Sequence, residues 1–299
     1  MHLQPTPGAR LSFSEMYETA HLSRGSLCRD NSLEPALPAC ISGSAGCLGR
    51  QNSHLIDLFP SMSDLAQSSV RNRLLAKLCP EDFDLLQPHL EPVALNRGDV
   101  LITPNQPIGY VYFLEAGITS VIANTAGGRR IEIGLTGRDG LAGTPVLLGV
   151  DSTPHETFMQ IAGSALRIKT ENLRHALQQS PSLHSLLLRY VQAFTIQTSH
   201  TALSNGSHKI EERLARWLLM CHDRVDGDDL PITHEFIALM LGVRRAGVTE
   251  ALNILEGRGI IRTGRGNIVV LKRAKLEEAA GDSYGVPEAE YHRLIGPLT

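Results

Sequence analysis

The stretch that decides the fold runs from Leu230 to Leu271 and reads LPITHEFIALMLGVRRAGVTEALNILEGRGIIRTGRGNIVVL. Its apolar run at 236–240 predicts a short helix that stops at Leu241-Gly242-Val243. A second helix begins with Arg244-Arg245 and keeps its apolar residues on one face, namely Val248, Leu252 and Leu255. A glycine turn and two short β runs follow. This order is typical of a helix-turn-helix with a β wing.

The second helix of this motif begins with two cations. Side chains at the start of such a helix reach base edges in the major groove, and a guanidinium matches guanine O6 and N7 or a phosphate. Between Pro231 and Lys275 eight Lys and Arg oppose three Glu, a net +5 that leaves −8 for the rest of a chain whose total is −3. A solvated basic face would give the same balance. Combined with the helix pattern, however, the charge predicts double-stranded DNA as partner.

Residues 1–61 are rich in Ser, Gly and Pro and lack periodicity, so we expect them to be disordered, with Met62 as a true or alternative start. No run of residues is apolar and long enough for a membrane span, and residues 1–30 contain no secretory signal. We therefore expect a cytoplasmic protein. No C-x-x-C pair occurs among the five cysteines, so neither a metal nor a cofactor is predicted; they are Cys28, Cys40, Cys47, Cys79 and Cys221.

From Glu91 to Lys169 the pattern changes to short β runs separated by Gly- and Pro-rich turns. A helical pattern over residues 65–78 precedes them. Many short strands with such turns indicate an antiparallel sandwich or barrel, interrupted by one short helix near residues 141–148. The predicted strands cover residues 93–95, 100–102, 110–114, 118–123, 131–133 and 165–168.

A long helix is predicted from Pro181 to Ser204. One set of its residues is spaced four, three, four and three apart: Leu187, Val191, Phe194, Thr198 and Thr201. This spacing is that of a coiled-coil seam and predicts a dimer helix. The alternative is a helix packed on its own barrel. A further helix, Ile210–Cys221, is expected beneath the helix-turn-helix.

In this order the features resemble the Crp/Fnr superfamily of bacterial transcription regulators, over about Leu65 to Lys275. The likeness rests on YFLEAGI (112–118), the cassette Gly137–Leu148, EERLARWLL (211–219) and LGVRRAGVT (241–249). It implies an α+β fold, with a cyclic-nucleotide-binding-like β-roll (jelly roll), a long dimerisation helix and a winged helix-turn-helix. We accordingly expect an extension over 1–61, a sensor domain over 62–180, the dimerisation helix over 181–205, a DNA-binding domain over 206–275 and a C-terminal tail over 276–299.

The resemblance also implies a homodimer that reads a palindromic operator, activates or represses transcription, and contacts RNA polymerase. The residues that bind cyclic nucleotides in the family do not occur at the matching positions of this chain. Members that bind cyclic nucleotides use a Glu where this cassette has Thr144, and an Arg where His155 stands. A largely neutral His lacks the bidentate fork that a phosphate needs, and Glu156 beside it would repel one. We therefore expect the effector not to be cAMP, and keep Thr144 and His155 as pocket candidates.

Two other sensing modes of the family are poorly supported. An iron–sulfur cluster needs a tight set of cysteines, whereas Cys28, Cys40 and Cys47 are widely spread. A haem needs an axial His or Cys in the β region, and nothing distinguishes His89 or His155.

On the DNA side, Arg245 stands where the catabolite activator protein has its guanine-reading Arg, so we expect it to read bases. We expect Arg244 to touch phosphate and Thr249 to face a base edge. Glu250 could accept from a cytosine amino group or lie in solvent. Thr233 would cap the first helix, whose N–H groups could hold a phosphate. Arg265, in the wing turn, could reach the DNA backbone or remain solvated.

Two alternative functions belong to other classes. A cupin-like β-barrel enzyme would need clustered metal-binding residues such as His-x-His, and none occurs. A non-DNA effector-binding module would not need the cations or the wing. The sequence contains neither a Gly-x-Ser-x-Gly elbow nor a phosphate loop, so we expect no enzyme.

Overall fold

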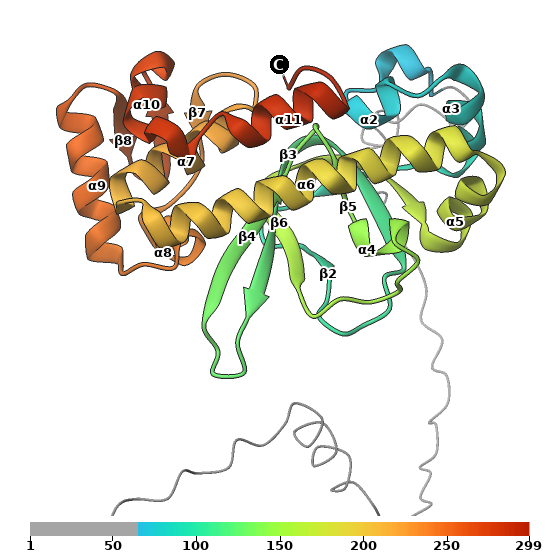
Figure 1. The fold of residues 1–299 in the computed structure, drawn as a ribbon, viewed down its shortest axis with the longest axis horizontal. Coiled ribbons are helices and arrows are strands. Elements are labelled where there is room, and N and C mark those ends of the chain that lie inside the picture. The colour runs from blue at the N-terminus through green and yellow to red at the C-terminus, as the bar shows by residue number, and fades with distance from the viewer. Residues whose placement is uncertain (1–64, 299) are drawn as a thin grey trace, which may run out of the picture. The chain divides into compact units, whose positions relative to one another are not determined.

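The computed structural model describes residues 65–298, which belong to one compact unit (Figure 1). The expectations for residues 1–61, for Met62 and for the three cysteines before it lie outside the described residues. In the described part, no helix is both long and apolar enough to cross a membrane.

The described chain begins with short helices rather than one long helix. They are η1 (Gln67–Ser69), α2 (Arg73–Ala76), α3 (Pro80–Leu86) and η2 (Gln87–His89). Asn72 starts α2, because its side chain accepts from Leu74 N and Leu75 N at 3.1 and 3.2 Å. The apolar residues that suggested a helical pattern, such as Leu74 and Leu75, are fully buried.

Six antiparallel strands form the β-roll, which confirms the predicted α+β class. They are β1 (Glu91–Leu95), β2 (Val100–Ile102), β3 (Tyr110–Asn124), β4 (Arg130–Thr136), β5 (Leu141–Ala142) and β6 (Glu156–Lys169). The sheet order is β1-β6-β3-β4, with β2 paired to β6 and β5 to β3. Helix α4 (Thr144–Leu147) is the predicted short helix.

The two longest strands differ from the prediction. Residues 110–114 and 118–123 form one strand, β3, whose register shifts on either side of Ala116. Gly117 has φ +82°, and a Cβ there would lie 2.5 Å from Ile161 O. Gly117, which suggested a turn, therefore lies in a β-bulge where β3 closely approaches β6. Strand β6 likewise begins at Glu156, well before the predicted 165–168.

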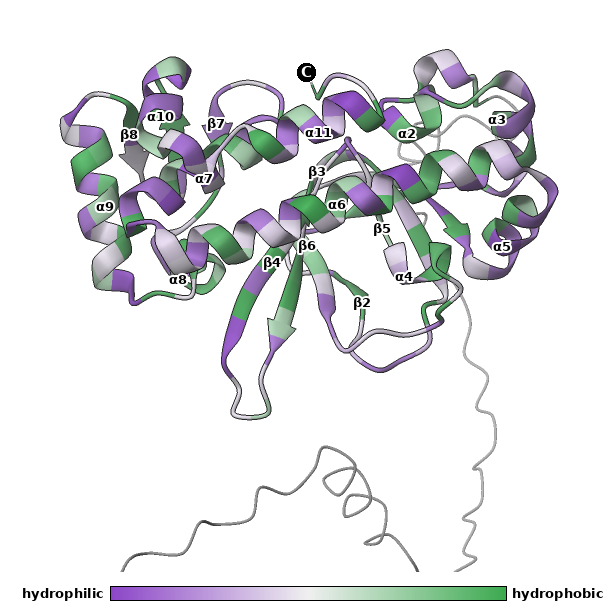
Figure 2. Cartoon of the chain, in the orientation of Figure 1, coloured by the Kyte–Doolittle hydropathy of each residue, from purple (hydrophilic) through white to green (hydrophobic). Residues whose placement is uncertain are grey.

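Helices α5 (Thr170–Gln179) and α6 (Pro181–Ser207) follow the sheet; the first was not predicted. Figure 2 shows hydrophobic and hydrophilic residues alternating along α6. Two residues of the predicted seam pack against the β-roll side of the chain. Leu187 is 1% exposed and Phe194 covers Gly134 of β4, whereas Val191, Thr198 and Thr201 are half-buried. The alternative, a helix packed on its own barrel, describes α6 at Leu187 and Phe194, and the dimer helix stays a prediction.

The C-terminal part contains the predicted helix-turn-helix and wing. Its elements are α7 (Ile210–His222), β7 (Asp229–Leu230), α8 (His234–Leu241), α9 (Arg245–Gly257), β8 (Ile261–Gly264), β9 (Asn267–Val270), α10 (Arg273–Ala280), η3 (Gly281–Ser283) and α11 (Val286–Leu294). The small sheet has the order β7-β9-β8. The segment 276–299, expected as a tail, instead contains most of α10 and all of α11 over its described residues.

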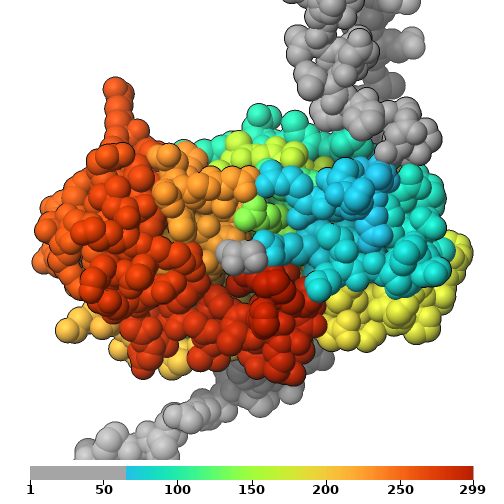
Figure 3. Space-filling model, turned by 90° about the horizontal axis from the view of Figure 1, so that it is seen from above, coloured from blue at the N-terminus to red at the C-terminus, as the bar shows by residue number. Residues whose placement is uncertain are grey.

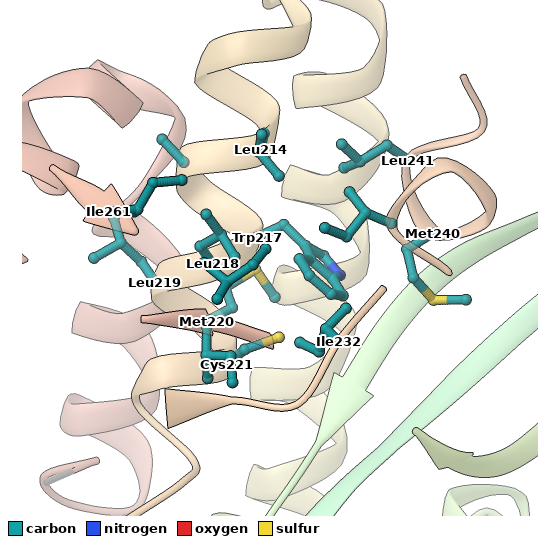
Figure 4. Close-up of a cluster of buried hydrophobic side chains, with 14 of the residues drawn as sticks. Leu214, Trp217, Leu218, Leu219, Met220, Cys221, Ile232, Met240, Leu241 and Ile261 are labelled. Atoms are coloured by element: carbon teal, nitrogen blue, oxygen red, sulfur yellow. The ribbon is translucent and has the colours of Figure 1, made fainter. Parts of the chain in front are cut away.

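One hydrophobic core joins the sheet to the helix-turn-helix. Ile118, Leu135 and Phe158 of the sheet belong to the same buried cluster as Trp217 of α7 and Met240 of α8. Figure 4 shows Trp217 and Ile232 next to each other, with Met240 on the side nearer the sheet. Burial of this apolar surface holds α7 and α8 against the β-roll.

Candidate nucleic-acid interface

Helix α8 is fixed at both ends by local chemistry. The Thr233 hydroxyl accepts from Phe236 N at 3.3 Å, which makes it the predicted N-cap. At the other end Gly242 adopts φ +62°, and a Cβ there would lie 2.9 Å from Ile131 Cδ1. A glycine is therefore needed both for the left-handed turn and for the close approach to β4.

Helix α9 presents a polar face to solvent. Arg244 is its N-cap residue and Arg245 its first residue, and both are exposed. Val248 and Leu252, expected as core, are fully buried on the opposite face. A shallow, open hollow covers the exposed face and is lined by Arg245, Ala246, Thr249, Glu250, Asn253 and Ile254.

Two of these residues refine the prediction. Thr249 is half-buried, and its hydroxyl donates to Arg245 O at 3.1 Å, so its remaining polar capacity is as an acceptor. Asn253 is exposed and lies eight residues after Arg245, on the same face. Sequence reasoning missed it, although the four-residue spacing from Arg245 through Thr249 could have found it. An Asn amide can pair with adenine N6 and N7.

The wing is attached to α9 and lies beside the start of α8. The Thr263 backbone N–H and hydroxyl both donate to the Glu256 carboxylate at 2.7 Å, and these bonds hold the pKa of Glu256 below its ordinary value. A Cβ on Gly266 would lie 3.8 Å from Thr233 Cγ2. The exposed Arg265, which precedes Gly266 in the wing turn, is thus next to the α8 N-terminus.

A short chain of neighbours connects these parts. Thr249 Oγ1 of α9 lies 3.5 Å from His234 Nδ1, and His234 follows Thr233. The structure therefore places the N-termini of α8 and α9 and the wing turn in one region. Its exposed cations can bind phosphate, and its polar α9 side chains can bind base edges.

The two pocket candidates in the β-roll are not joined by a hydrogen bond in the described part. Thr144 is the half-buried first residue of α4. His155 directly precedes β6, and its buried Nδ1 has no hydrogen-bond partner among residues 65–298. Glu156, expected to repel a phosphate, forms an ion pair with Arg130. The ion pair therefore reduces that repulsion. The chain still has Thr144 and His155 in place of the Glu and Arg that bind cyclic nucleotides.

The other sensing modes gain no support from the described residues. His89 is exposed at the end of η2. Within residues 65–298, no group of three or more His, Cys, Asp or Glu is placed to hold a metal ion.

A buried carboxyl lies where the sheet meets α7. Glu132 of β4 is 4% exposed, and its Oε1 accepts from Trp217 Nε1 at 2.8 Å. Its buried Oε2 has no hydrogen-bond partner among the described residues. Burial raises the pKa of Glu132 to about 7.

Comparison with known proteins agrees with this architecture. Residues 212–279 match the family model of the Crp-like helix-turn-helix domain. A global nitrogen regulator of Nostoc sp. is 26% identical over 190 residues, which cover 60% of this chain and 85% of the relative. Its counterpart from Synechocystis sp. is 26% identical over 224 residues, 71% of this chain and 98% of the relative.

Solved structures show the same fold. FixK2 from Bradyrhizobium japonicum superposes with a TM-score of 0.57 at 20% identity, covering 64% of this chain and 98% of that one. A Crp/Fnr-family regulator from Eubacterium rectale gives 0.55 at 17% identity, covering 69% and 97%. These likenesses and the helix-turn-helix match point to regulators rather than enzymes. The chain is a DNA-binding transcription regulator with a Crp-like helix-turn-helix domain, similar in sequence to the global nitrogen regulators and in fold to Crp/Fnr-family proteins.

Proposed function

We propose that the protein acts as a homodimer that binds a palindromic duplex site, with one α9 helix of each subunit in the major groove. The observation that carries this proposal is the exposed face of α9, which begins at Arg244 and Arg245 and lies beside the wing. Two such helices related by a two-fold axis would enter grooves about one turn apart, ~34–36 Å.

The residues predicted from the sequence have the following proposed roles. Arg245 reads a guanine through its planar fork, and Arg244 contacts phosphate. Thr249 accepts from a base edge, and Glu250 accepts from a cytosine amino group. The α8 N-terminus after Thr233 binds phosphate through its free N–H groups.

Arg265 contacts the DNA backbone from the wing. Its support is its exposure in the wing turn beside Thr233.

For dimerisation we propose a different face of α6 from the predicted seam. The exposed residues of α6 include a set spaced four, three, four, three and four apart, which we name the α6 flank: Leu188, Gln192, Thr195, Ser199, Ala202 and Gly206. This flank is about a quarter turn from the predicted seam at 3.6 residues per turn. It keeps the coiled-coil spacing, and its mostly small side chains allow two helices to approach closely.

The remaining assignments follow from the resemblance to the Crp/Fnr superfamily. The β-roll (62–180) senses an effector other than cAMP, through a pocket that includes Thr144 and His155. Residues 206–275 bind DNA, and residues 181–205 join the two functions. Activation or repression then proceeds through contact with RNA polymerase in the cytoplasm.

Sedimentation velocity tests the dimer. Ser199→Arg places a cation at the centre of the α6 flank and should convert a micromolar dimer to monomer. His200→Arg adds the same charge about 100° further round the helix and should leave the dimer intact. A wild-type monomer at micromolar concentration, or equal effects of the two variants, would contradict the proposal.

A further inference from the structure

The C-terminal segment 281–298 leaves the helix-turn-helix region and returns to the β-roll. It comprises η3, α11 and residues 295–298. Figure 3 shows this segment (red) next to the first described residues (blue). Arg73 Nη1 of α2 donates to Pro297 O at 2.5 Å. Tyr291 and Ile295 are 5% and 8% exposed, and they belong to the core of the β-roll and α6.

One end of this segment holds the loop between β4 and β5. The Tyr291 hydroxyl donates to Asp139 O at 2.6 Å. The Asp139 carboxylate, 3% exposed, forms a bidentate pair with Arg224, at 2.7 Å from Nη2 and 3.0 Å from Nε. A Cβ on Gly140 would lie 2.1 Å from Tyr190 Oη, so α6 also presses on this loop. The loop is thus enclosed by α6, α11 and the residues after α7.

The other end of the segment holds the end of α7. Asp223, which follows α7, is 3% exposed and accepts from Arg273 Nη2 at 2.7 Å. It also accepts from the Tyr284 hydroxyl at 2.8 Å. Arg224, the next residue, donates to Met220 O at 2.8 Å as well as to Asp139. Consecutive residues at the end of α7 are therefore bound to the C-terminal segment and to the β4–β5 loop.

This arrangement connects the β-roll with the DNA-binding domain. The β4–β5 loop opens the cassette 137–148, which contains Thr144. The end of α7 belongs to the matched DNA-binding domain. We propose that residues 281–298 form a clamp that couples the loop 137–140 to the end of α7, so that a change in the cassette reaches the DNA-binding helices through Asp139 and Arg224. The clamp covers α6 and the β-roll and leaves the exposed face of α9 open, so it acts by position rather than by blocking DNA.

Hydrogen exchange on the full chain without DNA tests the clamp independently of dimerisation and of any operator. Tyr291→Phe removes only the hydroxyl that holds Asp139 O. We expect amides in peptides covering 137–143 and 216–224 to exchange about fivefold faster, the change in opening equilibrium that the loss of a typical hydrogen bond gives. Tyr110→Phe, at the start of β3 outside the clamp, is the matched control and should change neither peptide.

A second variant tests the coupling as a whole. A chain ending at Ala280 should unfold in two transitions rather than one and become protease-sensitive at 225–228, between α7 and β7. A single transition with an unchanged midpoint would overturn the clamp. Faster exchange at 137–143 with none at 216–224 in Tyr291→Phe would overturn transmission through Asp139 and Arg224, whether or not the shortened chain folds.

Discussion

Glu132→Gln should make the protein more stable at alkaline pH and flatten the dependence of its stability on pH. The Glu132 carboxyl is buried between β4 and α7, and among residues 65–298 it accepts a hydrogen bond from Trp217 alone, through Oε1. An ionised carboxylate there lacks the solvation and the partners that it has in the unfolded chain. Glutamine keeps an oxygen that can accept from Trp217 and cannot ionise.

The magnitude follows from the raised pKa of Glu132, about 7 against an ordinary 4.5. Between these two values the folded chain keeps the proton that the unfolded chain has lost. The free energy of unfolding therefore falls as pH rises, and the loss is complete above the folded pKa. At ~1.4 kcal/mol per pKa unit the full cost is on the order of 3 kcal/mol. About 2 kcal/mol of it should appear between pH 5.5 and 8.5.

Denaturant unfolding of wild type and variant at these two pH values measures the effect. Any cost of burying the glutamine amide is the same at both pH values. The difference in unfolding free energy between wild type and variant therefore changes with pH only through ionisation of the Glu132 carboxyl. Glu278→Gln is the control, because its side chain is 59% exposed on α10 and should leave the wild-type pH dependence unchanged. Parallel pH curves for wild type and Glu132→Gln would refute the reasoning.

Three further predictions concern the interface, the clamp and the effector. In fluorescence anisotropy, Arg245→Ala should cost ~1–3 kcal/mol of binding free energy for the preferred site and little for random DNA. Arg244→Ala should instead weaken binding to all duplexes alike and lower the slope of log affinity against log salt by about one. Equal effects of Arg245→Ala on the preferred site and on random DNA would contradict these roles. Asp139→Asn should destabilise the fold by ~3–5 kcal/mol, because it leaves Arg224 buried without its charge partner. Asp226→Asn, at a carboxylate 63% exposed, should cost ~0–1 kcal/mol in the same denaturant assay, so similar losses would argue against the buried pair. Calorimetric titration should detect no micromolar affinity for cAMP, and such affinity would show that the cassette is misaligned.

Local patterns in the sequence predict the helix-turn-helix, the wing and most strands. The spacing of Val248 and Leu252 identifies the buried face of α9, and its opposite face follows. The bulged β3 was missed because Gly117 has the sequence appearance of a turn, whereas its role is a close approach to a distant strand, β6. Such contacts between residues far apart in the chain leave no periodic signal.

Contacts between distant residues also explain why helix α11 and the burial of Glu132 were not predicted. Helix α11 is short, and the buried Tyr291 within it and Ile295 just after it gain their partners from α6 and the β-roll. Glu132 stands between two isoleucines in an alternating strand, a pattern that suggests a solvent-facing side chain. It is α7, more than eighty residues later, that covers it. The sequence pattern predicts Arg244 and Arg245 at the start of α9 and Thr233 at the N-cap of α8, whereas the exposure of Asn253 is seen only in the structure.

In-vitro selection from a random duplex pool tests most directly the claim that α9 reads DNA sequence. The wild-type chain should enrich a two-fold-symmetric motif with half-sites about one helical turn apart. Arg245→Ala should lose the preference at one position of each half-site while the rest of the motif persists. Enrichment of no motif by the wild-type chain, or of an unchanged motif by the variant, would contradict the account.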